Sequence, residues 1–208
     1  EVDEAVADVL EHAQRLLRRP RFHELCKQAI EAVLARQIDH LEARAVLAEL
    51  ESYPNTWSQQ AAQWDERASE LLATKPREAA ELWFRAAELY VVYGEQTEAA
   101  LVPIDKALMA QQGHPGALAL LEEIYAVSSL FAELAMKLEM MAAYAREPSV
   151  AVNLYLKAAL VQQQQAQKPE AAARLYQRVL QVQPGQSDAS RALVEYHRSR
   201  SEWDRAQQ

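Results

Sequence analysis

The strongest constraint on the fold of this chain is an internal repeat. When the 208 residues are shifted against themselves by 72 positions, a series of identities falls between residues 79 and 117. They match Ala79, Leu82, Ala86, Ala87, Glu98, Ala99, Ala100, Leu108, Gly113 and Ala117 to Ala151, Leu154, Ala158, Ala159, Glu170, Ala171, Ala172, Leu180, Gly185 and Ala189. A shift of 74 positions ties in the N-terminal part, where His40 and Ala43 match His114 and Ala117. Each long unit holds four helical stretches, so the elementary repeat is a helix pair of about 35 residues, the period of helical solenoids.

The composition predicts that these stretches are helices. The chain has 4 glycines and 8 prolines, and 50% of its residues are hydrophobic. Because Gly and Pro supply turns, their scarcity leaves room only for short connections and disfavours a sheet with many hairpins. The predicted fold class is therefore all-α.

Helix boundaries follow from hydrophobic periodicity and from proline and glycine positions. The expected helices cover residues 2–18, 21–36, 40–52, 57–74, 77–93, 97–111, 116–128, 130–145, 149–166, 169–182, 187–200 and 202–208. Together they make six antiparallel pairs. Pro54 lies between two of these helices, whereas Pro103 lies inside one and predicts a kink.

The pairs resemble the tetratricopeptide repeat (TPR) family, in which a large residue, small residues and an aromatic follow one another along the first helix, and small residues line the second. The matching residues are Trp83, Ala86, Ala87, Tyr90, Ile104 and Ala107, then Tyr155, Ala158, Ala159, Ala172, Tyr176, Val179 and Pro184. The match departs at 54–76, where few positions fit. The resemblance implies a right-handed α-solenoid of about six TPR-like helix pairs. Ala13, Ala87 and Ala159 fit it physically, because small residues let two helices approach to about 8–10 Å.

The whole chain, residues 1–208, is expected to be one TPR-like solenoid domain. A solenoid normally ends in a polar capping helix, whereas this chain starts and stops within amphipathic helices. We therefore expect a piece of a longer bacterial repeat protein, whose open solenoid ends allow self-association.

Charge and hydropathy exclude some partners. The net charge is −8, and residues 51–146 hold 7 basic and 14 acidic groups, which disfavours nucleic-acid binding. No apolar run approaches the roughly 18 residues of a membrane span, so membrane insertion is not expected. The predicted location is cytoplasmic, and a periplasmic one stays open because residue 1 need not be the natural start.

The residues show no pattern typical of catalysis, so the chain is not expected to be an enzyme or to need a cofactor. Phosphate-binding and nucleophile motifs are missing from the sequence, and the histidines show no metal-ligand spacing. His40 and His114 occupy equivalent helix starts and are expected to be structural. Cys26 is expected in the core, the adjacent pair Asp65 and Glu66 on a solvated face.

One aromatic position recurs in the repeat, as Trp57, Phe131 and Trp203. Such a series could stack on a bound peptide, but its helical spacing favours core packing.

The TPR resemblance implies a binding groove lined by the first helix of each pair. The residues it places there are Arg44, Glu51, Glu81, Phe84, Glu88, Val91, Leu118, Glu122, Tyr125, Asn153 and Leu156. We predict that binding is centred on Phe84, Leu118 and Tyr125, with Glu88 and Glu122 as an acidic surround. The expected ligand is an apolar or basic amphipathic segment of a protein or peptide. The alternative for Phe84 is that it packs inside its own pair.

These observations favour a protein-interaction scaffold or adaptor. The Lys-x-x-x-Asn and Lys-x-x-x-Arg patterns with which some family members clamp a C-terminal carboxylate are missing from the groove positions, which disfavours an adaptor for chaperone tails. The alternatives are a regulatory or localising arm of a larger enzyme or transcription factor, and a periplasmic assembly factor of a secretion or envelope system. A catalytic solenoid and an RNA-processing scaffold are more distant alternatives.

Overall fold

The computed structural model describes residues 2–199, with side chains from residue 6 onward, and all regular secondary structure in this part of the chain is helical. It contains ten α-helices, one short 3-10 helix and one π-helix, with 81% of residues helical and no strand among those described. The predicted all-α class is confirmed. None of the described helices combines the length and the apolar character that crossing a bilayer requires.

The chain forms two compact units, Glu1–Leu120 and Leu121–Gln208. Unit 1 contains α1 (Val2–Leu16), η1 (Pro20–Phe22), α2 (His23–Arg36), α3 (Leu41–Leu71), α4 (Pro76–Val92) and α5 (Leu101–Ala110). Helix α6 (Pro115–Val127) starts in unit 1 and ends in unit 2. Unit 2 continues with α7 (Phe131–Ala143), α8 (Pro148–Leu160), the π-helix η2 (Val161–Gln165), α9 (Pro169–Val182) and α10 (Ser187–Ser199). A single solenoid domain over 1–208 stays a prediction.

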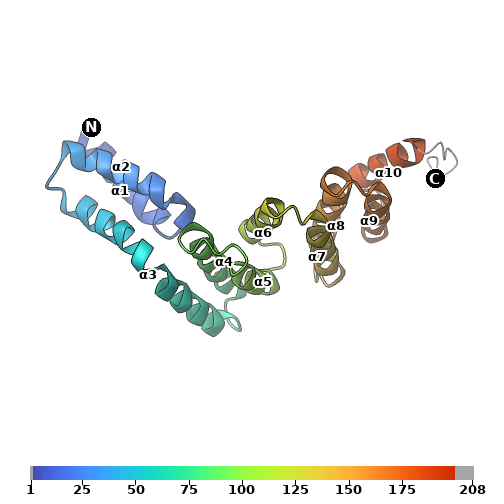
Figure 1. Ribbon diagram of the computed structural model, residues 1–208, viewed down its shortest axis with the longest axis horizontal. Helices are drawn as coiled ribbons and strands as arrows, with labels where there is room; N and C mark the ends of the chain where they lie inside the picture. Colours follow the sequence, from blue (N-terminus) through green and yellow to red (C-terminus); the bar gives the residue numbers. More distant parts are fainter. Residues whose placement is uncertain (1, 200–208) are drawn as a thin grey trace. The chain divides into compact units, whose positions relative to one another are not determined.

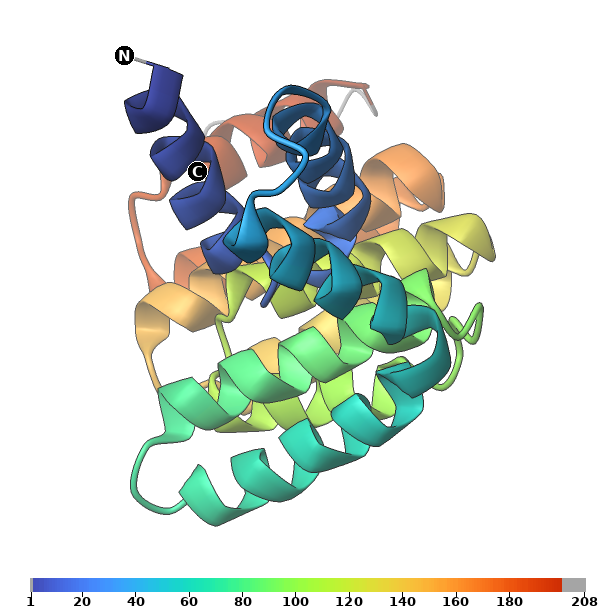
Figure 2. The same cartoon turned by 90° about the vertical axis from the view of Figure 1, so that its left-hand side faces the viewer.

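Within each unit, helices pack mainly on their neighbours in the chain. In unit 1, α1 packs on α2, α2 on α3, α3 on α4, and α4 on α5, and both views show α3 and α4 side by side (Figures 1 and 2). In unit 2, α7 packs on α8, α8 on α9, and α9 on α10. This order of contacts is typical of helical repeats, in which each element contacts only adjacent ones.

The first core of unit 1 lies between α1, α2 and the start of α3. It consists of Val6, Leu10, Ala13, Leu17, Cys26, Ile30, Val33, Ala43, Val46 and Leu50. Cys26 is buried, with its Sγ 4.0 Å from the carbonyl oxygen of Ala13, so its predicted core role is confirmed.

A second cluster, between α3 and α4, is aromatic. Trp57 packs edge-on against Tyr90, with ring centroids 5.4 Å apart, which confirms core packing for this member of the aromatic series. Trp203, the last member, lies outside the described residues. Nearby, the buried His23 ring lies 4.3 Å from Tyr53 and its Nδ1 is 2.6 Å from the hydroxyl of Tyr93.

Two proline predictions were wrong. The expected break at Pro54 is absent, because α3 runs from Leu41 to Leu71 with Pro54 inside it. Packing of one continuous helix on both α2 and α4 outweighs the lost backbone hydrogen bond. Hydroxyl donors also serve nearby carbonyls: Ser52 donates to Glu49 at 2.7 Å and Thr56 to Ser52 at 3.0 Å.

Pro103 produces no mid-helix kink. Helix α5 starts at Leu101 rather than 97, so Pro103 falls in its first turn, where a missing N–H costs little. The expected helix 202–208 lies outside the described residues.

The internal repeat has a structural counterpart in burial and helix starts. Ala87 and Ala159 are both fully buried, as are Ala117 and Ala189. Three equivalent side chains accept a hydrogen bond from the N–H three residues later: His40 Nδ1 from Ala43 at 3.4 Å, His114 Nδ1 from Ala117 at 3.1 Å, and Gln186 Oε1 from Ala189 at 2.9 Å. The predicted structural role of both histidines is confirmed, because each satisfies a free N–H of a helix start.

Candidate interaction site

Helix α4 carries a charged cluster whose partners come from the turn after α1. Glu81, Arg85 and Glu88 follow one another at spacings of four and three, which puts them on one helix face. Arg19 and Arg21 approach that face because Pro20 opens the 3-10 turn η1, which packs on α4. The cluster therefore joins the first helix pair of unit 1 to α4.

Glu88 is the buried centre of this cluster. Its side chain is 1% exposed, with Oε1 3.7 Å from Arg21 Nε and Oε2 4.0 Å from Arg19 Nε. Glu88 Oε2 and Arg19 Nε both lack a hydrogen-bond partner within residues 2–199. Burial raises the pKa of Glu88 to about 7, although the two arginines act to lower it.

Glu81 is held in its charged form. Its carboxylate contacts His114 Nε2 at 3.2 Å and Arg85 Nε at 3.0 Å. The hydrogen bond from His114 is the main cause of the lowered pKa of Glu81, and Arg85 and Arg19 add to it. His114 therefore links two elements, because its other ring nitrogen caps α6.

Phe84 fills the space beneath the charges. It is 4% exposed, its ring lies 5.2 Å from His114, and the guanidinium of Arg19 lies 5.5 Å from the ring centroid. A methyl group on Gly116 would lie 2.6 Å from the Phe84 ring, so glycine is required at that position for α6 to approach. Phe84 is thus an internal contact of unit 1.

Beside the cluster lies an open depression of about 380 Å³, lined by Arg18, Leu71, Arg77, Glu78, Glu81, Leu82 and Arg85. We call it the α4 depression. Its carboxylates are already paired, Glu78 with Lys75 at 2.8 Å and Glu81 with Arg85. Arg18 and Arg77 are exposed, and their guanidinium groups form no ion pair or hydrogen bond with any residue of 2–199. Two guanidinium groups are thus left available at this surface.

The predicted groove residues are not all at the surface. Phe84, Glu88 and Leu118 are buried, whereas Glu81, Val91, Glu122, Tyr125 and Leu156 are partly exposed, and Arg44, Glu51 and Asn153 are exposed. Because Phe84, Glu88 and Leu118 are buried, these three side chains offer little surface to a ligand, and their role in binding stays a prediction. Arg44 pairs with Asp39 at 3.0 Å, and Glu122 pairs with Lys157.

The structure distributes the predicted groove over both units. The residues up to Leu118 belong to unit 1, and Glu122, Tyr125, Asn153 and Leu156 belong to unit 2. A groove that combines them stays a prediction.

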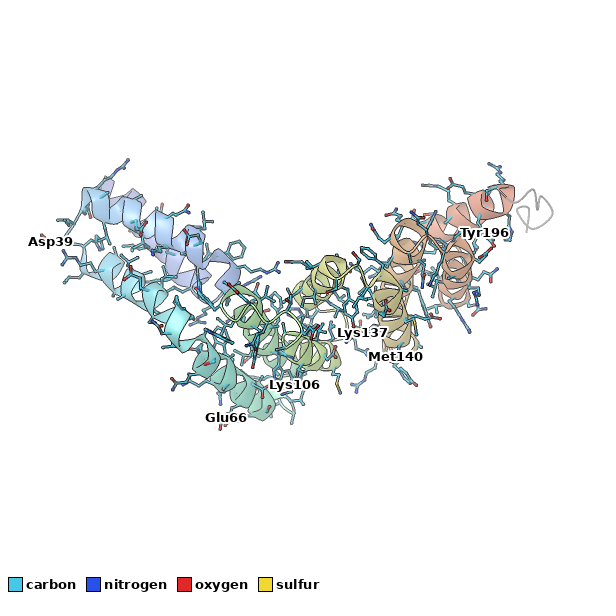
Figure 3. All side chains as sticks on the ribbon, viewed as in Figure 1. Asp39, Glu66, Lys106, Lys137, Met140 and Tyr196 are labelled. Carbon is cyan, nitrogen blue, oxygen red and sulfur yellow. The ribbon has the colours of Figure 1, made fainter. Side chains whose placement is uncertain are left out.

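The sequence analysis did not single out several residues of this site. The consecutive arginines Arg18 and Arg19 were a visible signal, but only the packing of η1 on α4 shows what they contact. Asp65 was expected on a solvated face. Instead its carboxylate accepts hydrogen bonds from Trp83 Nε1, at 2.8 Å, and from Lys106. Figure 3 labels Lys106 and Glu66, the residue that follows Asp65 in the chain.

Within residues 2–199, no group of three or more His, Cys, Asp or Glu side chains is arranged to hold a metal ion. Comparison with known sequences gives no further assignment: no protein-family model matches this chain, and a search of curated proteins finds no match either.

Proposed function

We propose that this chain is a protein-interaction module, a scaffold or adaptor built as a right-handed solenoid of TPR-like helix pairs. Three features support this proposal: sequential packing of neighbouring helices, equal burial of repeat-matched alanines, and repeated capping of equivalent helix starts. Such a chain presents a long series of helix faces, and binding is the function these faces serve best.

The observation that carries the proposal is the α4 depression, where Arg18 and Arg77 are unpaired although the protein is acidic overall. A guanidinium group binds a carboxylate through two parallel hydrogen bonds. Leu71 and Leu82 supply an apolar wall beside these donors. The depression suits an Asp or Glu side chain within a partner peptide.

A carboxylate fits this surface better than a phosphate group. Glu78 and Glu81 also line the depression, and their negative charges repel a dianion about twice as strongly as a monoanion. A nucleic-acid backbone is disfavoured by the same two carboxylates and by the net charge of −8.

The partner chemistry predicted from the sequence, an apolar or basic segment, does not match α4. That prediction relied on Glu88 and Glu122 as an acidic surround, whereas Glu88 is buried against Arg19 and Arg21, and Glu122 lies outside unit 1. For this surface we therefore replace it with an acidic segment.

The test uses two labelled peptides of equal length, one with Glu at alternate positions and one with Lys there. We expect the Glu peptide to bind in fluorescence anisotropy and the Lys peptide not to bind. Replacing Arg18 and Arg77 with Ala should weaken the Glu peptide about tenfold, because two charge-assisted contacts are lost.

The matched control replaces Arg174 and Arg178 with Ala on α9, which removes the same charge from exposed positions in unit 2. Equal weakening by both double variants would reduce the effect to net charge and contradict the site. Binding of neither peptide would contradict the α4 depression as an acidic-peptide site.

A further inference from the structure

Helix α7 presents an apolar stripe to solvent. Met136, Met140 and Tyr144 follow at intervals of four, and their exposed fractions are 66%, 57% and 77%. This spacing places them along one face of the helix and the residue that follows its end. Met140 is labelled on α7 in Figure 3. We call these three residues the α7 stripe.

The repeat shows that folding does not require this stripe. With the shift of 74 positions, α7 matches the second half of α3, and Ala61 and Ala68 are buried like their counterparts Ala135 and Ala142. The α3 residues at the stripe positions are Ala62, Glu66 and Glu70, all exposed.

A solvated helix face is normally polar, as it is in that half of α3. Single exposed apolar residues need no explanation, but an ordered row of large ones does. The exposed apolar row is therefore present on α7 and not on the matching half of α3. Folding of the repeat does not explain it, whereas binding of a partner does.

Two acidic residues lie next to the α7 stripe. Glu133 and Glu139 are exposed on α7, within one turn of Met136 and Met140. Neither glutamate forms an ion pair or hydrogen bond with another side chain in the described part of the chain. At 100° per residue, Glu133 precedes the row on the same face, Glu139 lies on one side of it and Lys137 lies on the other. The row is therefore next to two acids that form no ion pair, and one basic residue lies on its far side.

We propose that the α7 stripe binds an amphipathic helix of a partner protein, with apolar residues in register with Met136, Met140 and Tyr144 and with Lys or Arg on its flanks. From Met136 to Tyr144 the stripe covers about 12 Å along the helix axis, at ~1.5 Å per residue, which matches a little over two turns of a partner. Methionines adapt their shape to different apolar side chains, and charge complementarity selects basic flanks.

This inference goes beyond the proposed function, because it names a second surface with the opposite ligand chemistry. It does not depend on the α4 depression. The ligand class agrees with the apolar or basic amphipathic segment that the sequence predicts, although the surface is one that the sequence did not single out.

Two other occupants fit less well. In a dimer of α7 stripes, Glu133 and Glu139 of both copies would approach one another, and like charges at an interface are costly. A membrane surface that carries anionic lipids would meet the same two carboxylates, whereas helices that lie on membranes are rich in Lys and Arg.

The experiment selects binders from a displayed library of single helices with randomised surface positions. The wild-type chain is the target. The counter-target carries Met136→Ala, Met140→Glu and Tyr144→Glu, which restores acidic or small residues like those of α3. Selected helices should carry an apolar row flanked by Lys or Arg, and a synthetic copy should bind the counter-target about tenfold or more weakly.

Three controls make the result decisive. Met109→Glu introduces the same kind of change at a residue 84% exposed on α5, and should leave affinity unchanged. Glu133→Gln with Glu139→Gln should slow association and flatten its salt dependence. Circular dichroism checks that each variant keeps its helices.

Selected helices with acidic flanks, or helices that bind the counter-target equally well, would overturn the proposal. A wild-type dimer in sedimentation that the counter-target loses would instead assign the stripe to a second copy. Because acidic peptides probe only the α4 depression, the two proposals can fail separately.

Discussion

Helices α4 and α8 are copies of one another in the repeat, and they differ in a way that separates folding from function. Both carry buried alanines at matched positions, Ala87 and Ala159 among them. Where α4 has the buried acid Glu88, however, α8 has Leu160, which is 44% exposed. The buried alanines at matched positions are common to both helices, whereas the charged cluster is present only on α4.

The difference shows that the charged cluster is not a requirement of this helix geometry. An acid without hydrogen bonds at one oxygen is a cost to stability rather than a contribution, because burial removes its hydration. Arg19 and Arg21 offset part of that cost. Replacing α4 residues by their α8 counterparts is therefore the direct way to measure what the cluster does.

The largest expected effect concerns Glu88 and pH. Its pKa is about 7 in the folded protein against an ordinary value of 4.5, so between these pH values the folded state binds the proton more tightly than the unfolded state. The contribution of Glu88 to stability is therefore greatest below pH 4.5 and falls as pH rises through 7, by about 3 kcal/mol in all. Urea unfolding of wild type and Glu88→Gln across this range measures the effect, and the variant should lose this fall.

Other groups act in the same range, so the difference between the two proteins is the quantity to compare. The lowered pKa of Glu81 gives stability that is present above pH 4.5 and lost below it. Desolvation lowers the pKa of His23, which gives stability that is lost as pH falls below 6.5. Glu88→Leu, the α8 residue, should be at least as stable as wild type at pH 8. A parallel pH dependence in wild type and Glu88→Gln would contradict a buried, protonated Glu88.

The repeated helices and their buried alanines could be predicted from the sequence, because they depend on signals between residues close together in the chain. Buried alanines, capping residues and most helix ends follow from spacing and side-chain chemistry, as at His114 and Ala117. Pro54 could not be placed, since the packing of α3 on two helices outweighs a proline preference that acts only locally.

The candidate site was less predictable because it depends on contacts between distant residues. The sequence places Glu88 on a helix face but gives no indication that Arg19, almost seventy positions earlier, will cover it. Phe84 is buried, but its ring contacts are with Arg19 and His114 rather than inside its own helix pair, which was the alternative considered for it. The α7 stripe was accessible in principle, because comparing Met136 and Met140 with Ala62 and Glu66 needs only the shift of 74.

A smaller effect should be common to both copies. Replacing Ala87 or Ala159 with Leu should destabilise the protein by about 1–3 kcal/mol each, because both sites are fully buried between packed helices. Thermal unfolding followed by circular dichroism measures the change. The control is Ala62→Leu at an exposed α3 position, which should change stability by less than about 0.5 kcal/mol. Unchanged midpoints for both core variants would show that the repeat alignment is wrong.

The smallest effects are expected at the three repeat-matched helix starts, where the capping hydrogen bonds differ in length. Alanine at His114 or Gln186 should cost about 1 kcal/mol, since each accepts from a helix N–H, at 3.1 and 2.9 Å. His114→Ala should cost more than Gln186→Ala, because it also removes the hydrogen bond to Glu81. His40→Ala should cost least, about 0.5 kcal/mol, since its bond to Ala43 is 3.4 Å long. Urea unfolding of the three variants gives the order. If His40→Ala and His114→Ala cost the same, the hydrogen bond from His114 to Glu81 contributes nothing to stability. The charged cluster on α4 would then not be coupled to the capped start of α6.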